Sequence, residues 1–263
     1  DINTGNILRA SKYTFHGLVA DTFKLNNCFL VGDSAHQMPP FLGQGLCQGI
    51  KDVYNLHWKL DGVLKGKYAN KVLDTYSNER ISIVKSVTET AIKHGGVIGT
   101  QNKYIALIRD TLLNVARIFP KLLSFFDFYH PWQITNGLID KSLYPNIANG
   151  IVISQPNLDL KVDNKSFDQY IGYNFTLIVF DQNEKLLNDI KALESSRIFE
   201  NNIYLINEDS LFNKDSNFIK WRKDNNISAV IIRPDKHVYG CCDNESMITK
   251  VDELNKKLIS ELT

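Results

Sequence analysis

The chain of 263 residues lacks a long hydrophobic run and carries almost no net charge. No apolar run approaches the roughly 20 residues that a membrane-spanning helix needs. The densest run, residues 175–180, has the length of a strand. The formal net charge of +1 provides no strong field to attract nucleic acid or an acidic membrane. We therefore expect neither of them among the partners of this protein.

Cysteine is also scarce, and the four that occur (Cys28, Cys47, Cys241 and Cys242) form no CxxC pair and no disulfide-like framework. This usage favours a reducing compartment, and we expect the cytoplasm. The histidines are scattered without metal-ligand spacing, so we expect no metal site. The chain opens on Asp1 without a signal peptide, and we expect it to be part of a longer protein.

The residues that are present divide the chain into two parts. A hydrophobic content of 43% suits a globular protein with one large core or two modest ones. The segment 144–159 is rich in proline, glycine and asparagine, which predicts a boundary. We therefore expect one domain over residues 1–150 and another over residues 151–263.

Hydrophobic periodicity and turn residues predict the elements of both parts. In the first part we expect a buried strand over 27–31 and helices over 45–64, 70–94 and 102–118, the second helix stopping at Gly95-Gly96. In the second part we expect strands over 174–180, 202–206, 227–232 and 237–241, and helices over 185–197, 212–223 and 247–262. A turn over 233–236 should join the last two strands. This order is typical of a small α/β domain.

The informative segment follows the first predicted strand, which delivers Gly32-Asp33 to its carboxyl end, where open α/β sheets bind ligands. Asp33 can accept hydrogen bonds from a sugar-like hydroxyl. Glycines at 43 and 45 leave room for a flat or phosphorylated ligand beside bare amides. The helix that starts there directs unpaired N–H groups at the ligand. The pattern predicts a ligand with a hydroxylated chain and with negative charge near a helix N-terminus.

Three groups of residues stand out in and after this segment. They are Gly32-Asp33-Ser34-Ala35-His36, the run MPPFLGQG, and the helix residues Asp52, Asn55, Leu56, Trp58, Lys59 and Leu60. Together they closely resemble the second flavin-binding motif of FAD-dependent aromatic hydroxylases. Arg9, Tyr13 and His16 upstream, and Tyr76, Glu79 and Arg80 downstream, also fit this family. The most similar branch is that of the 3-(3-hydroxyphenyl)propionate and phenol hydroxylases. The resemblance implies the C-terminal part of a doubly wound, Rossmann-like FAD domain over residues 1–150. It implies a thioredoxin-like domain without CxxC over residues 151–263.

The resemblance also implies a flavin site. Its cofactor-binding residues would be Gly32, Asp33, Pro40, Gly43, Gln44, Gly45, Leu46 and Cys47. Asp33 would bind the ribityl chain, and the loop at Pro40 would lie beside the isoalloxazine ring. The amides of Gly45, Leu46 and Cys47 would face the N1/C2=O edge of the flavin. No side chain stands out as a nucleophile or metal ligand, so we name no catalytic residue.

The family's reaction uses FAD as cofactor and NAD(P)H as co-substrate. The reduced flavin captures O2 as a C4a-hydroperoxide, which transfers oxygen to a phenolic ring. Such a protein would bind a small aromatic substrate and O2. The resemblance is compatible with a homodimer and leaves the oligomeric state open. It decides neither the phenol nor the choice between NADH and NADPH.

Several parts of the family pattern do not occur in this sequence. The GxGxxG turn for the pyrophosphate, the mid-chain NAD(P)H motif and a substrate-binding sheet are absent. We therefore expect roughly the C-terminal half of such an enzyme, inactive by itself. One alternative is a non-catalytic, split or decayed remnant that acts only in association. A second is a halogenase or epoxidase built on the same flavin fold.

For individual residues, simple structural roles compete with functional ones. His36 suggests acid–base catalysis, but packing and loop hydrogen bonding are favoured. Glu79-Arg80 is most simply a solvated or salt-bridged helix start. The aromatic stretch 119–132 favours core packing over a substrate or subunit surface.

Overall fold

The computed structural model describes residues 11–118, 132–157, 159, 161–162, 164–200 and 202–263. Arg9 and most of the aromatic stretch, residues 119–131, lie outside the described residues. Among the described residues, no helix combines the length and the apolar character that crossing a membrane requires.

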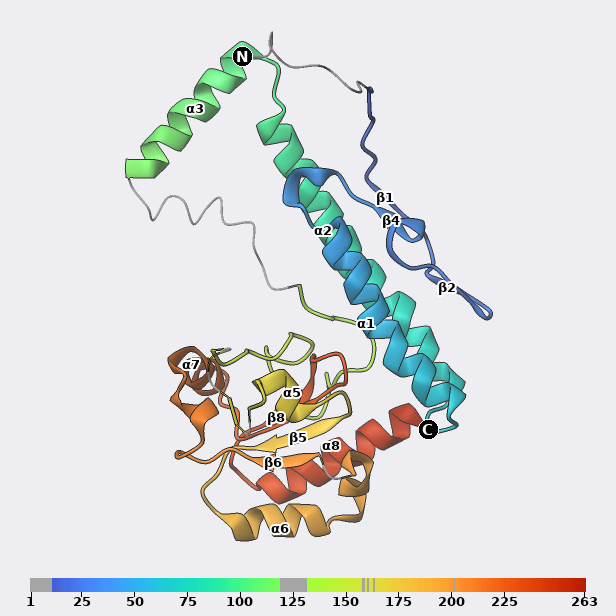
Figure 1. Ribbon diagram of the computed structural model, residues 1–263, viewed down its shortest axis with the longest axis vertical. Helices are drawn as coiled ribbons and strands as arrows, with labels where there is room; N and C mark the ends of the chain where they lie inside the picture. The colour runs from blue at the N-terminus through green and yellow to red at the C-terminus, as the bar shows by residue number, and fades with distance from the viewer. Residues whose placement is uncertain (1–10, 119–131, 158, 160, 163, 201) are drawn as a thin grey trace.

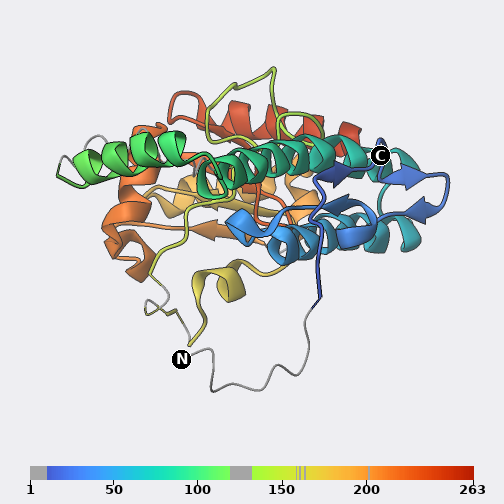
Figure 2. The same ribbon diagram turned by 90° about the horizontal axis from the view of Figure 1, so that it is seen from above.

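Short strands and long helices make up the first part of the chain. The strands pair as two antiparallel ribbons, β1 (Leu18–Val19) with β4 (His36–Gln37) and β2 (Lys24–Leu25) with β3 (Cys28–Phe29). Single 3₁₀ turns span Gly32–Ser34, Pro40–Leu42 and Asn70–Leu73. The helices are α1 (Gly45–Leu64), α2 (Asp74–Ile98) and α3 (Lys103–Ile118). Figures 1 and 2 show α1 and α2 side by side along most of their length.

The second part is built on a four-stranded sheet with the order β6-β5-β7-β8. Its elements in chain order are α5 (Phe167–Ile171), β5 (Thr176–Val179), α6 (Glu184–Ala192), β6 (Ile203–Leu205), α7 (Ser216–Asp224), β7 (Ala229–Ile232), β8 (Val238–Cys242) and α8 (Met247–Leu262). Strand β6 is parallel to β5, whereas β7 is antiparallel to both β5 and β8. The predicted α/β character and the predicted order of these strands and main helices are confirmed, and the structure is rich in helix.

Both faces of this sheet are covered, which explains why β5, β7 and β8 are buried throughout. On one face, Leu177 and Ile231 pack with Ile190 of α6 and Leu254 of α8. On the other face, the opposite residues of each strand pack with α5 and α7 (Figure 1). The turn after α1 reaches this unit, where the N–H of Ala69 donates to the carbonyl of Leu262 at the end of α8, 2.7 Å away.

The expectation of a buried strand over 27–31 is wrong, because the strand is shorter than predicted and is not buried. Only Cys28–Phe29 is strand, and its sole ladder among the described residues is the short ribbon with β2. Leu30, just after this strand, is 37% exposed, and Cys28 is exposed as well. The doubly wound sheet expected for residues 1–150 is not confirmed.

The predicted helix boundaries agree at 45–64, 102–118 and 247–262 to within one residue. Residues 185–197 and 212–223 are each divided between an α-helix and a 3₁₀ turn. The stop expected at Gly95-Gly96 is wrong, because α2 continues to Ile98. Gly95 instead permits a close contact, since a Cβ there would lie 2.3 Å from Cε2 of the Phe41 ring.

A buried group of charged side chains joins the two parts of the chain. It comprises Asn55 and Lys59 of α1, Glu79 of α2, and Arg233 and Asp235 of the turn between β7 and β8, and we call it the Glu79 cluster. Arg233 donates to both oxygens of Glu79, at 2.9 and 2.7 Å, and to both oxygens of Asp235, at 3.0 and 2.6 Å. Lys59 Nζ lies 2.8 Å from Glu79 Oε2.

The Glu79 cluster balances its charges, with two cations against two carboxylates. Burial alone would raise the pKa of Glu79, but the charges of Arg233 and Lys59 outweigh it and lower that pKa to about 2. Burial also lowers the pKa of Lys59 to about 8, in spite of its contact with Glu79. Every member is buried, so removal of one partner would leave another charge without compensation.

Glu79 should make the free energy of unfolding depend on pH in the acidic range. Its folded-state pKa of about 2 lies below the reference value of 4.5, so the unfolded chain takes up the proton first. Its contribution of roughly 3 kcal/mol is present above about pH 4.5 and is lost as the pH falls toward about 2. We expect Glu79→Gln to lower the free energy of unfolding at pH 7, with a difference from wild type that shrinks below pH 4.5. Urea denaturation across this range measures it, and a pH-independent difference would contradict the prediction.

The two adjacent glycines of α2 provide a matched test of the contact with Phe41. Gly95→Ala should force the ring and the Pro40–Leu42 turn to move, whereas a Cβ at Gly96 meets no atom within 4 Å. Alanine in a helix interior is favoured over glycine by about 1 kcal/mol, so Gly96→Ala should stabilise the protein. We expect the free energy of unfolding of the Gly95→Ala variant to be about 1–3 kcal/mol lower than that of the Gly96→Ala variant. Equal unfolding free energies would exclude a tight contact at Gly95.

Candidate functional site

Helix α1 buries a polar stripe next to Leu56 and Trp58, while most of the apolar residues that predict the helix are exposed. Gln48, Asp52, Asn55 and Lys59 recur at spacings of four, three and four, which aligns them on one face. Each of them is at most 2% exposed. The apolar residues Leu46, Ile50 and Val53 are each more than half exposed. The burial of this stripe is possible because every polar member of it has a partner.

Asp52 is the hub at the N-terminal end of this stripe. Its Oδ2 lies 2.8 Å from His36 Nε2 and accepts the N–H of Gly32 at 3.0 Å. Its Oδ1 accepts Arg80 Nε at 2.7 Å, and Arg80 also donates to Gln48. We call Gly32, His36, Gln48, Asp52 and Arg80 the Asp52 cluster.

The electrostatics of this cluster keep Asp52 ionised. Burial alone would raise the pKa of Asp52, but the hydrogen bond with His36 and the charge of Arg80 outweigh it and hold that pKa below its usual range. His36 has the packing and hydrogen-bonding role favoured from the sequence. The solvated alternative for Glu79-Arg80 is wrong and the salt-bridged one is confirmed, because both side chains are buried and ion-paired.

The Asp52 cluster holds the Gly32–Ser34 turn against α1. Gly32 has a φ of +60°, which favours glycine, and its N–H is fixed by Asp52. The turn also approaches α1 closely, since a Cβ at Gly49 would lie 3.3 Å from the Cα of Gly32. As a result, Asp33 is presented at the N-terminal end of α1.

Asp33 and the N-terminus of α1 meet at a cavity of about 370 Å³. Its walls come from the segment before β1, the turn after β3, and the loop that enters α1. They are formed by Tyr13, Phe15, His16, Asp33, Gln37, Met38, Pro39, Pro40, Gly43, Gly45 and Leu46.

The structure brings together most of the residues predicted to hold a cofactor. Those that line the cavity are Asp33, Pro40, Gly43, Gly45 and Leu46. The other three lie beside it: Gly32 adjoins Asp33, Gln44 is the residue before α1, and Cys47 is exposed in the first turn of α1. No group of three His, Cys, Asp or Glu side chains within the described ranges could hold a metal ion.

The cavity has the chemistry that a flavin with a hydroxylated chain requires. The carboxylate of Asp33 makes no hydrogen bond with any described residue, so it can accept one from a ligand. No side chain caps the first turn of α1, which leaves its N–H groups available to a negative group. A Cβ at Gly45 would meet no protein atom within 4 Å, so that backbone is open to a ligand. These features fit the predicted binding of FAD.

Sequence reasoning missed how the site is supported. It associated Asp52, His36 and Arg80 with the motif but assigned no anchoring role to Asp52. The signal was present in the four-residue spacing from Gln48 to Asp52 and in the charge of Arg80. This signal does not identify the residues that contact Asp52, because His36 and Arg80 lie 16 and 28 residues away from it along the chain.

The chain is similar to known flavin-dependent proteins in sequence and in fold. Residues 1–91 match the family model of an FAD binding domain, and residues 150–257 match that of the HcaD C-terminal domain. In fold, the chain resembles flavin-dependent monooxygenases. The monooxygenase PieE, solved with FAD and substrate, superposes with a TM-score of 0.65 at 19% identity over 95% of this chain and 50% of its own. A structure of RebC soaked with K252c superposes with a TM-score of 0.67 at 18% identity, over 97% of this chain and 49% of the RebC chain.

Two curated relatives show a closer similarity in sequence. Both are named 3-(3-hydroxy-phenyl)propionate/3-hydroxycinnamic acid hydroxylase. The one from Mycolicibacterium smegmatis is 31% identical over 188 residues, 69% of this chain and 34% of that protein. The one from Burkholderia cenocepacia is 33% identical over 182 residues, 68% of this chain and 33% of that protein. The chain is therefore related to the FAD-dependent aromatic hydroxylases, and its matched segment spans about one third of their length.

The anchoring role of Asp52 can be measured with a control on the same helix. Asp52→Asn removes a buried charge that pairs with Arg80, and we expect the free energy of unfolding to fall by about 3–5 kcal/mol. Asp61→Asn removes an exposed charge paired with Lys65 and should change it by less than about 1 kcal/mol. Urea denaturation at neutral pH compares the two. Similar effects of both substitutions would mean that Asp52 does not anchor the turn.

Proposed function

We propose that this chain forms part of an FAD- and NAD(P)H-dependent monooxygenase and binds the ribityl chain and the N1/C2=O edge of its flavin. The observation that carries the proposal is the meeting of Asp33 with the uncapped first turn of α1 at one cavity. The family match over residues 1–91 and the names of the curated relatives support it.

In this proposal each group of the cavity has a defined task. Asp33 accepts hydrogen bonds from the ribityl hydroxyls. The N–H groups of Gly45, Leu46 and Cys47 stabilise negative charge at the N1 edge, by up to ~2 kcal/mol in a partly buried geometry. The loop at Pro40 lies beside the ring and limits access of water. Bound FAD, reduced by NAD(P)H, supplies the activation of O2 and the transfer of oxygen to the substrate.

The substrate that we propose is a small phenolic compound, in line with the names of the relatives. Tyr13, Phe15 and His16 line the same cavity, and the rings of Tyr13 and Phe15 lie 5.2 Å apart. They would provide one apolar wall beside the flavin. The remaining walls and the doubly wound sheet of the FAD domain would come from the two thirds of the relatives' length that this chain does not match.

We further propose that residues 151–263 form a thioredoxin-like domain that acts as a scaffold, including any homodimer contact. The order β6-β5-β7-β8, with only β5 and β6 parallel, supports this assignment. A redox role is not proposed, because Cys241 and Cys242 are buried on β8 and burial raises the pKa of each thiol to about 12.

The test of the flavin assignment uses the native protein purified from its source. This preparation includes any polypeptide to which the chain is joined or bound. Asp33→Ala removes a charged acceptor and should weaken FAD binding by about tenfold or more. Asp61→Ala, at the other end of α1, should leave FAD binding unchanged. Flavin fluorescence titration of the apoprotein measures both. FAD affinity equal to wild type in the Asp33 variant would refute the assignment of this cavity.

A further inference from the structure

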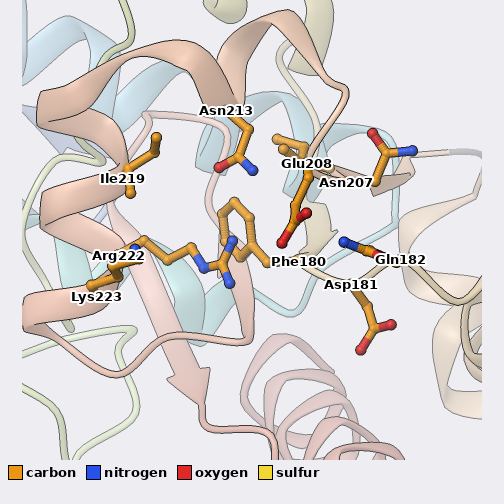
Figure 3. Close-up of a pocket in the computed structure, with 10 residues that line it drawn as sticks. Phe180, Asp181, Gln182, Asn207, Glu208, Asn213, Ile219, Arg222 and Lys223 are labelled. Atoms are coloured by element: carbon orange, nitrogen blue, oxygen red, sulfur yellow. The ribbon is translucent and has the colours of Figure 1, made fainter.

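A second cavity, of about 340 Å³, lies in the β5–β8 unit, outside the flavin site (Figure 3). Its walls come from the residues that follow β5 and β6 and from the 3₁₀ turn Leu211–Lys214 and helix α7. They are formed by Phe180, Asp181, Gln182, Ile206, Asn207, Glu208, Asn213, Ile219, Arg222 and Lys223. The carboxyl ends of parallel strands are where α/β sheets bind ligands. The cavity therefore has the position of a binding site.

The two charges that point into this cavity are of opposite sign. The guanidinium of Arg222 lies 4.9 Å from the centroid of the Phe180 ring. Figure 3 shows it directed toward the centre, with the carboxylate of Glu208 facing it from the other side. Within the described residues, Arg222 forms no ion pair within 4.0 Å with Glu208 or Asp181. Both charges consequently remain available to a ligand.

The rest of the lining narrows the kind of ligand. Asp181, Glu208, Arg222 and Lys223 together carry no net charge, so neither a bare anion nor a bare cation is favoured. Among the apolar lining residues, Ile219 is partly exposed and offers an apolar surface, whereas Phe180 and Ile206 are only 4% and 2% exposed. A neutral ligand with two separated charges and an apolar group is complementary to Arg222, Glu208 and Ile219.

We propose that this cavity binds a free α-amino acid with an apolar side chain. Arg222 pairs with the carboxylate, which its planar guanidinium can bind through two hydrogen bonds. Glu208 pairs with the ammonium through a charge-assisted hydrogen bond. The apolar side chain packs against Ile219. Neither the location nor the chemistry of this site depends on the proposed flavin function.

The experiment uses the whole chain and three probes of the same shape. L-Phenylalanine carries both charges, L-phenylalaninamide lacks the carboxylate, and 3-phenylpropanoate lacks the ammonium. We expect saturable binding of L-phenylalanine in isothermal titration calorimetry, and binding of each analogue about tenfold weaker or less. Equal affinity for 3-phenylpropanoate would overturn the proposal, because Glu208 would then contribute nothing. Absence of binding by L-phenylalanine, L-leucine and L-methionine alike would also overturn it.

Two variants locate the site. Glu208→Gln and Arg222→Gln should each weaken binding of L-phenylalanine about tenfold or more, whereas the exposed neighbours Asp209→Asn and Lys220→Gln should not. Glu208 is exposed and makes no ion pair within the described residues, so its variant should retain the stability of wild type. Undiminished binding in the Glu208 variant would overturn the proposal even if the Arg222 variant failed to fold. Perturbed NMR amide signals of Gln182 and Asn207, with those of Gly45 and Leu46 unchanged, would support this cavity over the flavin cavity.

Discussion

The structure depends on one constraint, that the polar stripe of α1 must find a partner for every charge it buries. A helix normally buries an apolar face, and α1 buries Asp52, Asn55 and Lys59 in addition to Leu56 and Trp58. An unpaired charge in such a place would cost several kcal/mol, so the opposing surface is tightly specified. Helix α2 meets the requirement with Glu79 and Arg80, two successive residues that serve different parts of the stripe.

Glu79 and Arg80 support two different parts of the molecule. Through Arg80, α2 helps to hold Asp52 and with it the Gly32 turn that presents Asp33. Through Glu79, it holds Arg233 and thus the turn that joins β7 to β8. Removal of one partner of such a buried pair would leave the other charge uncompensated, so both pairs constrain how α2 packs on α1. The helix pair is therefore a common support for the cavity and for the β5–β8 sheet.

Much of this fold could be predicted from the sequence, and the failures have identifiable causes. The bounds of α1 follow from apolar periodicity, even though most of those apolar residues are exposed. Periodicity reports regular structure but does not reveal which face is buried when polar residues are paired across the chain. The stop wrongly expected at Gly95-Gly96 came from helix propensity, whereas Gly95 serves the contact with Phe41. Arg233 and Glu79 are 154 residues apart, beyond the reach of any local pattern.

The candidate cavity was more predictable than its support, for a physical reason. The predicted ligand-facing residues lie between Gly32 and Cys47, so a strand end, a turn and a helix start are enough to bring them together. The support depends instead on long-range ion pairs. The turn at Arg233 contributes nothing to the cavity lining, yet its guanidinium fills the position between Glu79 and Asp235 that the helix pair requires. The β5–β8 unit is therefore joined through Arg233 to the same pair of helices, α1 and α2, that supports the cavity.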